Sequence, residues 1–172
     1  MSPRIEHVEG FCVAGLTERT CIAAEKNPAM SRIGSLWSRF FDEDAYERPA
    51  RTPDVRLFGV YSGYDLVKPE SFEVTAGVAV TDGSPLVHIE GGAYLVLEGR
   101  GRMPAVVQAL WEQAEAYLAN HPQWRRRYRS DFEAYAGPTE VALHIGVRRD
   151  EFANHPPHPQ PEISHASSHQ LV

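Results

Sequence analysis

The chain has 172 residues, with 23 acidic against 17 basic side chains and a net charge of −6 at pH 7. That length suits one domain, or two small halves, with a substantial hydrophobic core. The negative charge argues against a duplex nucleic-acid surface, and no apolar run reaches transmembrane length, so neither direct nucleic-acid binding nor a membrane location is expected. Two cysteines and an opening stretch interrupted by charges indicate a cytoplasmic protein without a disulfide framework, a zinc site or a signal peptide.

The first half of the chain is predicted to contain one strand, one helix and two further strands. Asn27 and Pro28 suggest the entry to the helix, which an apolar stripe at helical spacing continues to Phe41. The strands are indicated by segments rich in Val, Phe, Tyr and Thr. A strong turn at residues 82–85 marks the boundary between halves. The predicted strands are residues 10–19, 55–64 and 71–81.

The second half repeats that order. A second amphipathic stripe predicts a helix from about residue 103 to 118. The basic run from Arg125 to Arg127 reads as a solvated turn before a strand. The strands predicted in this half are residues 87–98, 128–136 and 140–148.

The composition changes near the end of the chain. Histidine, proline and serine dominate residues 152–172, and such a segment buries too little apolar surface to fold. Prolines also deny the histidines a fixed scaffold, so a disordered tail is expected rather than a metal site. We therefore predict one domain over residues 1–151, with halves of about 8–82 and 86–150.

An internal repeat links the two halves. The run Phe58–Tyr61 matches Phe132–Tyr135 at an offset of 74 positions, and the same offset carries Leu36-Trp37 onto Leu110-Trp111. Because tryptophan is rare, the equal spacing indicates a duplication. Each half is expected to fold as strand, helix, strand, strand, which predicts an α+β fold with antiparallel sheets and two long helices.

Glu133 is the sharpest candidate for a functional residue. Alternation along its strand places Asp131, Glu133 and Tyr135 on one face and Phe132 on the other. A negative charge beside aromatic rings attracts an organic cation. Gly59 holds the matching position in the first half, so only one half would contribute a charge. The alternative is a surface glutamate on a half-exposed strand, because glutamate is rarely buried unpaired.

Two tryptophans and several tyrosines are further candidates. Trp37 and Trp111 hold matching positions in apolar helical stripes, where they either pack in the core or face a ligand between the halves. Tyrosine hydroxyls need polar partners in a dry core, so one or two tyrosines are expected to line a wet pocket. The tyrosines proposed for the ligand site are Tyr61, Tyr94 and Tyr135.

Nothing in the sequence points to a cofactor or to a catalytic residue. His88 and His144 have no evident nucleophile or third group beside them, so satisfied or exposed histidines are the better interpretation. A glycine-rich phosphate loop, a nucleophile elbow and a zinc-protease motif do not occur.

The chain resembles the GyrI-like effector-binding domains, which include the ligand domains of many AraC-type activators and stand-alone integron-cassette binding proteins. The resemblance spans about residues 8–148. It is carried by a series of short motifs in the family's order: Glu18-Arg19-Thr20, Ile33–Phe41, Gly59-Val60-Tyr61, Ala76–Val80, Gly91–Tyr94 and Asp131–Tyr135.

This resemblance implies a tandem βαββ fold with pseudo-twofold symmetry, of the GyrI-like and SOUL-like type. It also implies a cleft between the halves for small organic ligands, often hydrophobic cations with aromatic groups. Glu133 matches the glutamate that pairs with the cation in the family. No helix-turn-helix segment fits before residue 8 or after residue 150, so a transcription regulator is expected to be a separate partner.

Three functions remain open from the sequence. The preferred one is a stand-alone binding or sensing protein, not an enzyme, which takes a hydrophobic cation at Glu133. The alternative is a hydrolase of cyclopropane-containing toxins or related xenobiotics, in which Glu133 and Tyr135 would assist water attack. A third is an interaction module that controls another protein without a small ligand.

Overall fold

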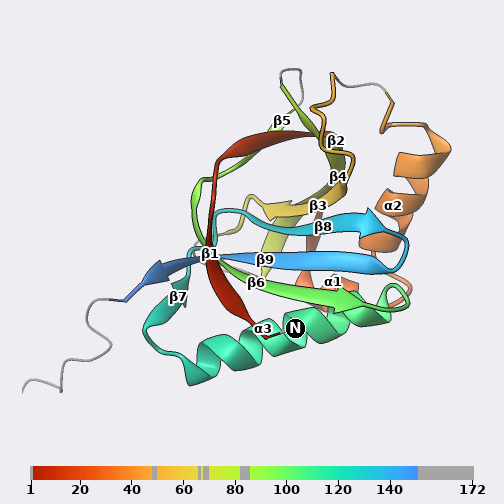
Figure 1. The fold of residues 1–172 in the computed structure, drawn as a ribbon. Helices are drawn as coiled ribbons and strands as arrows, with labels where there is room; N and C mark the ends of the chain where they lie inside the picture. Colours follow the sequence, from red (N-terminus) through yellow and green to blue (C-terminus); the bar gives the residue numbers. More distant parts are fainter. Residues whose placement is uncertain (1, 48–49, 66, 68–69, 82–85, 151–172) are drawn as a thin grey trace, which may run out of the picture.

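The computed structural model describes residues 2–47, 50–65, 67, 70–81 and 86–150. Within them the chain forms one curled antiparallel sheet in the order β1-β6-β9-β8-β3-β4-β2-β5, with β7 paired to β9 (Figure 1). The strands are β1 (Arg4–Val8), β2 (Phe11–Cys21), β3 (Leu57–Ser62), β4 (Ser71–Val80), β5 (Leu86–Ile89), β6 (Gly92–Arg100), β7 (Trp124–Arg126), β8 (Asp131–Gly137) and β9 (Glu140–Arg149). The helices are α1 (Ile22–Glu25), α2 (Ile33–Asp42) and α3 (Ala105–Asn120).

The predicted α+β repeat is confirmed. The units β2-α2-β3-β4 and β6-α3-β8-β9 have the same order, and they join where β3 pairs with β8. In that pairing Gly59 lies opposite Glu133, and these are the two residues that the 74-residue offset relates. A twofold axis that exchanges the halves therefore passes between them.

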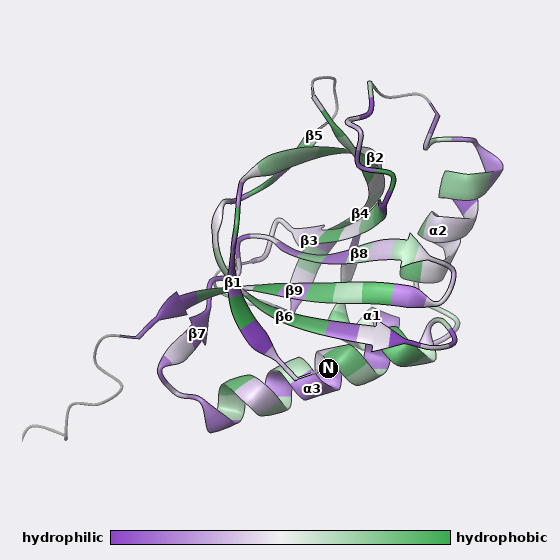
Figure 2. Ribbon diagram, viewed as in Figure 1, coloured by the Kyte–Doolittle hydropathy of each residue, from purple (hydrophilic) through white to green (hydrophobic). Residues whose placement is uncertain are grey.

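Both long helices cover one face of the sheet. Leu36 and Phe40 of α2 pack on β2, β3 and β4, while Leu110 and Ala114 of α3 pack on β6 and β9. The opposite face carries a third cluster around Phe58 and other buried residues, which the curl of the sheet helps to enclose. Figure 2 shows the hydrophobic colour on much of the central strands, whereas α3 carries both kinds of residue along its length.

The edges of the sheet differ from the prediction. Residues 87–98 were expected as one strand, but the chain breaks between Ile89 and Gly92. Gly92 has φ +142, a conformation that favours glycine, so the chain can turn there. β5 then pairs with β2 whereas β6 pairs with β1 and β9, and this change of partner closes the curl. β1 and β7 were not predicted, because five and three residues are too few to show a clear alternation.

The start of α2 also differs from the prediction. The helix begins at Ile33, and the residues after Asn27 form a turn instead. The Glu25 carboxylate accepts hydrogen bonds from the backbone N–H groups of Arg32 at 3.0 Å and Ile33 at 3.4 Å. A carboxylate at this position satisfies free N–H groups and favours the positive end of the helix dipole. The helix end at Asp42 lies one residue beyond the predicted one.

Some predictions fall outside the described residues. These are the turn at residues 82–85 and the tail at 152–172. Among the described helices, none combines the length and the hydrophobicity needed to cross a bilayer.

Candidate functional site

The carboxylate of Glu133 lies at the centre of the sheet, on the face that the helices cover. The residue is 2% exposed. Its Oε1 accepts hydrogen bonds from the hydroxyl of Tyr61 at 2.9 Å and from the indole N–H of Trp111 at 2.8 Å. Its Oε2 accepts a third from the hydroxyl of Tyr135 at 2.6 Å. The side chain is therefore buried but well partnered, which excludes the surface glutamate that the sequence left open.

Burial and hydrogen bonding act on this carboxylate in opposite directions. Burial raises the pKa of Glu133, and the hydrogen bonds from Tyr135, Trp111 and Tyr61 oppose that rise without cancelling it. Burial, followed by the negative charge of Glu133, raises the pKa of Tyr135 well above its ordinary range, so its hydroxyl keeps its proton and remains a donor. The site thus contains one buried carboxyl group among aromatic rings, and its hydrogen bonds offset only part of the energetic cost of burying its charge.

Four aromatic rings surround Glu133 in two matching pairs. Trp37 on α2 meets Tyr135 edge-to-face, with ring centroids 5.3 Å apart and planes at 76°. Trp111 on α3 meets Tyr61 in the same way, at 5.0 Å and 71°. The 74-residue offset relates the two tryptophans and the two tyrosines. We call these four rings together with Glu133 the central aromatic cluster.

Gly59 explains why the cluster holds a single carboxylate. A Cβ at this position would lie 2.9 Å from Oε2 of Glu133 and 3.3 Å from the ring of Trp37. The Glu133 side chain thus occupies the space that a side chain at Gly59 would need. Because the two positions face each other across the axis, only one half of the repeat can supply the charge.

The structure does not bring Tyr94 to this cluster. Tyr94 packs with Phe132 on the opposite face of the sheet, in the third core cluster. Its hydroxyl donates to the backbone carbonyl of Glu90 at 2.6 Å and lies 3.1 Å from the Ser130 hydroxyl. The polar partner that its hydroxyl was expected to need is thus the carbonyl of Glu90, which lies between β5 and β6. The other five predicted residues, Glu133, Tyr135, Trp37, Trp111 and Tyr61, do come together.

A second polar network adjoins the cluster and was not predicted as a site. Asp131 is fully buried, and its Oδ2 accepts hydrogen bonds from Nη2 of Arg126 at 2.6 Å and from the Tyr64 hydroxyl at 2.6 Å. Its Oδ1 accepts the backbone N–H of Gly146 at 2.7 Å. Alternation had placed Asp131 on the face of Glu133, which was the available signal for this network.

The environment of Arg126 differs most from the prediction. The predicted solvated turn is strand β7, and the guanidinium of Arg126 lies over three rings, those of Tyr128 at 4.6 Å, Tyr64 at 5.2 Å and Trp111 at 5.3 Å. These distances suit cation–π contacts. Burial alone would lower the pKa of Arg126, but the charge of Asp131 raises it, so the group is a permanent cation.

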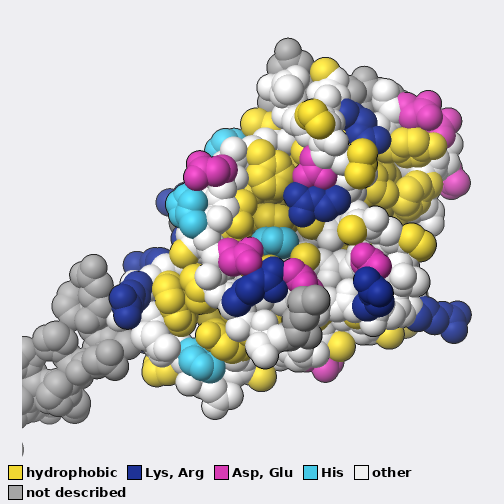
Figure 3. Space-filling model, viewed as in Figure 1, with side chains coloured by type: hydrophobic (Ala, Val, Ile, Leu, Met, Phe, Trp, Pro, Cys, Tyr) yellow, Lys and Arg dark blue, Asp and Glu magenta, His cyan; other side chains and the backbone are white. Residues whose placement is uncertain are grey.

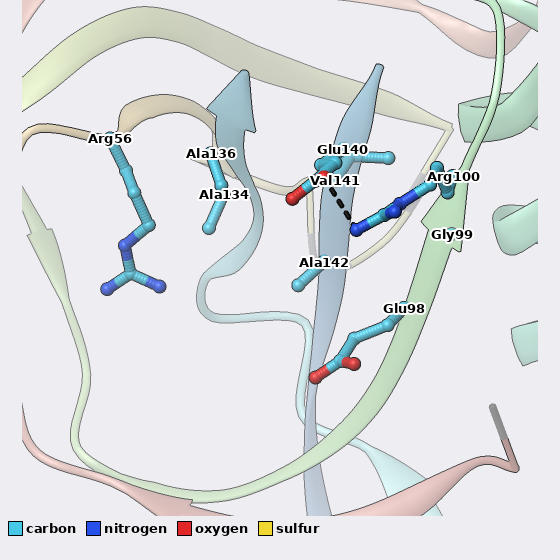
Figure 4. A pocket seen from close by; sticks show the side chains of 9 residues that line it. All are labelled: Arg56, Glu98, Gly99, Arg100, Ala134, Ala136, Glu140, Val141 and Ala142. Carbon is cyan, nitrogen blue, oxygen red and sulfur yellow. Dashed lines mark ion pairs between the residues drawn. The ribbon is translucent and has the colours of Figure 1, made fainter. Parts of the chain in front are cut away.

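Glu133 itself does not line either of two cavities in the described part of the chain. One of about 400 Å³, on the opposite face of the sheet, has a floor of small residues that includes Ala134 and Ala142 (Figure 4). Its charged side chains are paired, for example Arg100 with Glu140 at 2.6 Å. The other cavity, of about 610 Å³, lies between α3, β7 and β9 and shares Trp111 with the cluster. The second cavity is therefore the one that adjoins the candidate site.

The two histidines that the sequence singled out, His88 and His144, lie in different surroundings. His144 is 8% exposed, stacks on Phe132 with centroids 4.2 Å apart, and has Nδ1 3.2 Å from the carbonyl of Ala142. Burial lowers its pKa to about 4. The Nδ1 atom of His88 lies 3.6 Å from the Cys12 thiol. Across the residues that the structure describes, no group of three or more potential metal ligands occurs.

Comparison with known proteins places the chain in a family. The family model described as integron-associated effector binding protein (Cass2) matches residues 4–155. An integron cassette protein from the mobile metagenome of Vibrio cholerae has 30% identity and a TM-score of 0.73, over 85% of this chain and 95% of that one. No curated protein matches the chain in sequence.

Two structures with 15% identity share the fold. One is SAV2435 bound to tetraphenylphosphonium, with a TM-score of 0.69 over 86% of this chain and 94% of that one. The other is a putative bacterial transcription regulation protein from Staphylococcus aureus, with a TM-score of 0.68 over 86% and 99%. The family match, the V. cholerae relative and the fold agree, and this chain belongs to the integron-associated effector binding protein family.

Proposed function

We propose that this protein binds a small organic cation with bulky apolar or aromatic groups at the central aromatic cluster, without chemical turnover. The observation that carries the proposal is the buried carboxylate of Glu133 held among four aromatic rings. A desolvated negative charge attracts a cation strongly, and the faces of tryptophan and tyrosine rings attract it further. An apolar cation also loses little hydration energy when it enters such a site.

The raised pKa of Glu133 supports the same ligand class. Burial disfavours the charged form of this carboxylate, and three hydrogen bonds do not fully offset that effect. A bound cation would stabilise the charged form and lower the pKa again. Cation binding would therefore relieve an electrostatic cost that the unliganded protein carries.

A ligand would reach the cluster through its exposed rings. Trp37, Trp111 and Tyr135 are half-buried, so each of these residues keeps some contact with solvent. Phe41 is 49% exposed and stacks on Trp37, with centroids 6.0 Å apart and planes at 27°. Figure 3 shows hydrophobic side chains gathered over α2, next to an acidic group. These features favour an aromatic or bulky apolar ligand body at this end.

Binding is favoured over hydrolysis by the hydrogen bonds of Glu133. A hydrolase would need the carboxylate to activate water and a second group to protonate the leaving atom. Both oxygens of Glu133 already accept hydrogen bonds, and its neighbour Tyr135 has a pKa raised by burial, which makes that hydroxyl a poor acid. The biological role would be sensing or sequestration, with a transcription regulator or another protein as the partner.

Calorimetric titration with tetraphenylphosphonium tests the proposal, since a protein of the same fold binds that cation. Triphenylphosphine oxide serves as a neutral counterpart with three of the same phenyl groups. We expect saturable, one-to-one binding of the cation and binding of the neutral compound at least about tenfold weaker, which corresponds to roughly 1.4 kcal/mol. Equal affinities would contradict a role for charge, and the absence of any binding would contradict the site.

A further inference from the structure

We propose that Arg126 is a built-in cation that fills one of two matching half-sites of the cluster, so that the protein accepts a ligand with one positive charge and rejects one with two. This inference rests on the proposed cation-binding function. It adds two properties of the ligand. The ligand lies in the half of the cluster that contains Trp37 of α2, and it carries a single positive charge.

The first step is that the repeat creates two equivalent aromatic surfaces. Ring separations and edge-to-face angles are similar in the pair Trp37–Tyr135 and the pair Trp111–Tyr61. Glu133 lies between the two pairs. A cation attracted to Glu133 could in principle lie against either tryptophan. The two half-sites must therefore be distinguished by what else contacts each ring.

The second step is that a guanidinium already occupies the Trp111 half. The Cζ atom of Arg126 lies 5.3 Å from the Trp111 ring, and the rings of Tyr64 and Tyr128 complete a three-ring cage around it. Asp131 holds the group in place through hydrogen bonds to Nε at 3.0 Å and Nη2 at 2.6 Å. The side chain is 20% exposed, so it closes this cage from outside.

The third step is that the Trp37 half lacks such an occupant. The isolated bridge of Arg51 to Val80 corresponds in the fold to the pairing of Arg126 with Val147, so Arg51 is the counterpart of Arg126. Arg51 is exposed, and its Nη2 donates to the carbonyl of Val55 at 3.2 Å. Within the described residues, no arginine or lysine is placed over the Trp37 ring.

The helices show the same difference between the halves. Phe41 stacks on Trp37 one turn further along α2, and the 74-residue offset carries this position to Glu115 on α3. The Trp37 half thus continues into an exposed aromatic ring, whereas the Trp111 half continues into a charged residue that lines the same cavity as Arg126. An aromatic cation is better accommodated on the α2 side.

The charges then determine the ligand class. The charge of Asp131 is paired with Arg126, which leaves Glu133 as the single carboxylate of the cluster without a cationic partner. One positive charge on a ligand balances Glu133. A second positive charge on the same small molecule would approach the fixed guanidinium of Arg126, and like charges repel at short range even where Asp131 offsets part of that charge. A dication should therefore bind more weakly than its monocationic isostere.

The test uses two ligands of equal shape. Both carry triphenylphosphonium on a butyl chain, which ends either in a trimethylammonium or in an isosteric tert-butyl group. For the wild-type protein, titration calorimetry should give a dissociation constant for the monocation at least about tenfold below that of the dication. In Arg126→Gln that ratio should fall to near one or reverse, because the repulsion is gone and Asp131 becomes available.

Two further variants make the comparison specific. Arg126→Lys keeps the charge and should keep the wild-type ratio. Arg125→Gln removes one charge from the neighbouring exposed position, which pairs with Asp150, and should also leave the ratio unchanged. Circular dichroism and a cooperative melting transition establish that each variant is folded.

The outcomes separate this inference from the proposed function. If neither ligand binds the wild type, the cation site itself is wrong and both proposals fail. If the monocation binds but the dication binds equally well to the wild-type protein, only the role of Arg126 is refuted, whether or not Arg126→Gln folds. A wild-type preference that persists unchanged in a folded Arg126→Gln variant would also refute it.

Discussion

At the scale of single residues, the proposed recognition of a cation depends on the side chain of Glu133. In Glu133→Gln the amide oxygen can take the place of Oε1 and accept from Trp111 and Tyr61, while the amide nitrogen donates to the hydroxyl of Tyr135. The variant therefore keeps the shape and the hydrogen bonds but removes the charge. Tetraphenylphosphonium affinity should fall about tenfold or more, because a charge-assisted contact contributes roughly 1.5–3 kcal/mol.

The matched control for that prediction is Tyr135→Phe, which removes one hydrogen bond to Glu133 and leaves its charge. Cation affinity should fall less in this variant than in Glu133→Gln, as measured by calorimetry.

The pH dependence of stability provides a second check on the charge of Glu133. Because the folded pKa of Glu133 is raised, the free energy of unfolding of the wild type should decline relative to Glu133→Gln as the pH rises from about 4.5 through that pKa. If Glu133→Gln weakened the binding of a neutral ligand as much as that of the cation, Glu133 would act through the shape of the site and not through its charge.

His144 should give the protein an acid-sensitive stability of its own. Its pKa is lowered by burial to about 4, against 6.5 for the free side chain, so the unfolded chain takes up this proton first as the pH falls. The contribution is fully present above pH 6.5 and is lost as the pH falls through the folded pKa, by up to about 3 kcal/mol. Urea unfolding of wild type and His144→Phe between pH 7 and pH 4 should show a shallower decline in the variant.

A suitable control for that experiment is His7→Gln, because the His7 side chain is 68% exposed. It shows how the loss of an exposed histidine compares with the loss of the buried His144. A decline that is equally steep in His144→Phe would mean that other groups account for the acid sensitivity. The conserved ring shape of phenylalanine should keep the stack on Phe132, so that packing alone does not alter the result.

At the scale of elements, we expect Glu25 to set where α2 begins and hence where Trp37 lies. The carboxylate accepts from the hydroxyls of Thr20 at 2.5 Å and Ser31 at 2.7 Å, as well as from the first N–H groups of the helix. Glu25→Ala should lower the free energy of unfolding by about 1–2 kcal/mol, the usual loss for a helix cap. Chemical denaturation measures this change.

Displacement of α2 should also weaken the ligand site in Glu25→Ala. Trp37 lies just over one turn from the start of the helix, so tetraphenylphosphonium affinity should fall together with stability. Ser38→Ala is the control on the same helix, because the Ser38 hydroxyl donates only to the helix carbonyl of Gly34 at 3.2 Å. If Glu25→Ala matched Ser38→Ala in both measurements, the carboxylate would not be what positions α2.

At the scale of the whole molecule, the domain should function without residues 153–172. The prediction rests on the composition of this segment, whose proline, histidine and serine residues bury too little apolar surface to offset the entropy of ordering. A chain truncated after Phe152 should keep the wild-type melting temperature and the same tetraphenylphosphonium affinity. A drop in melting temperature of several degrees would show that the segment packs on the domain.

The sequence by itself determined the repeat and, through it, most of the residues of the candidate site. A constant offset relates Trp37 to Trp111 and Tyr61 to Tyr135, and residues that are equivalent in a duplicated fold must be related by its axis. Alternation then placed Glu133 and Tyr135 on one face of their strand. These inferences held because alternation and equal spacing can be read from the order of the residues alone. Neither requires knowledge of which segments pair in the fold.

Only the tertiary structure decided which further side chains lie beside the cluster and which do not. Tyr94 lies in a strand with the right composition, yet the pairing of β6 with β1 and β9 turns its ring to the opposite face. Arg126 belongs to a run of three arginines that reads as solvated, yet the three residues of β7 place its guanidinium beside Asp131 and Trp111. Strand partners and buried ion pairs depend on segments distant in the chain, and no local pattern records them.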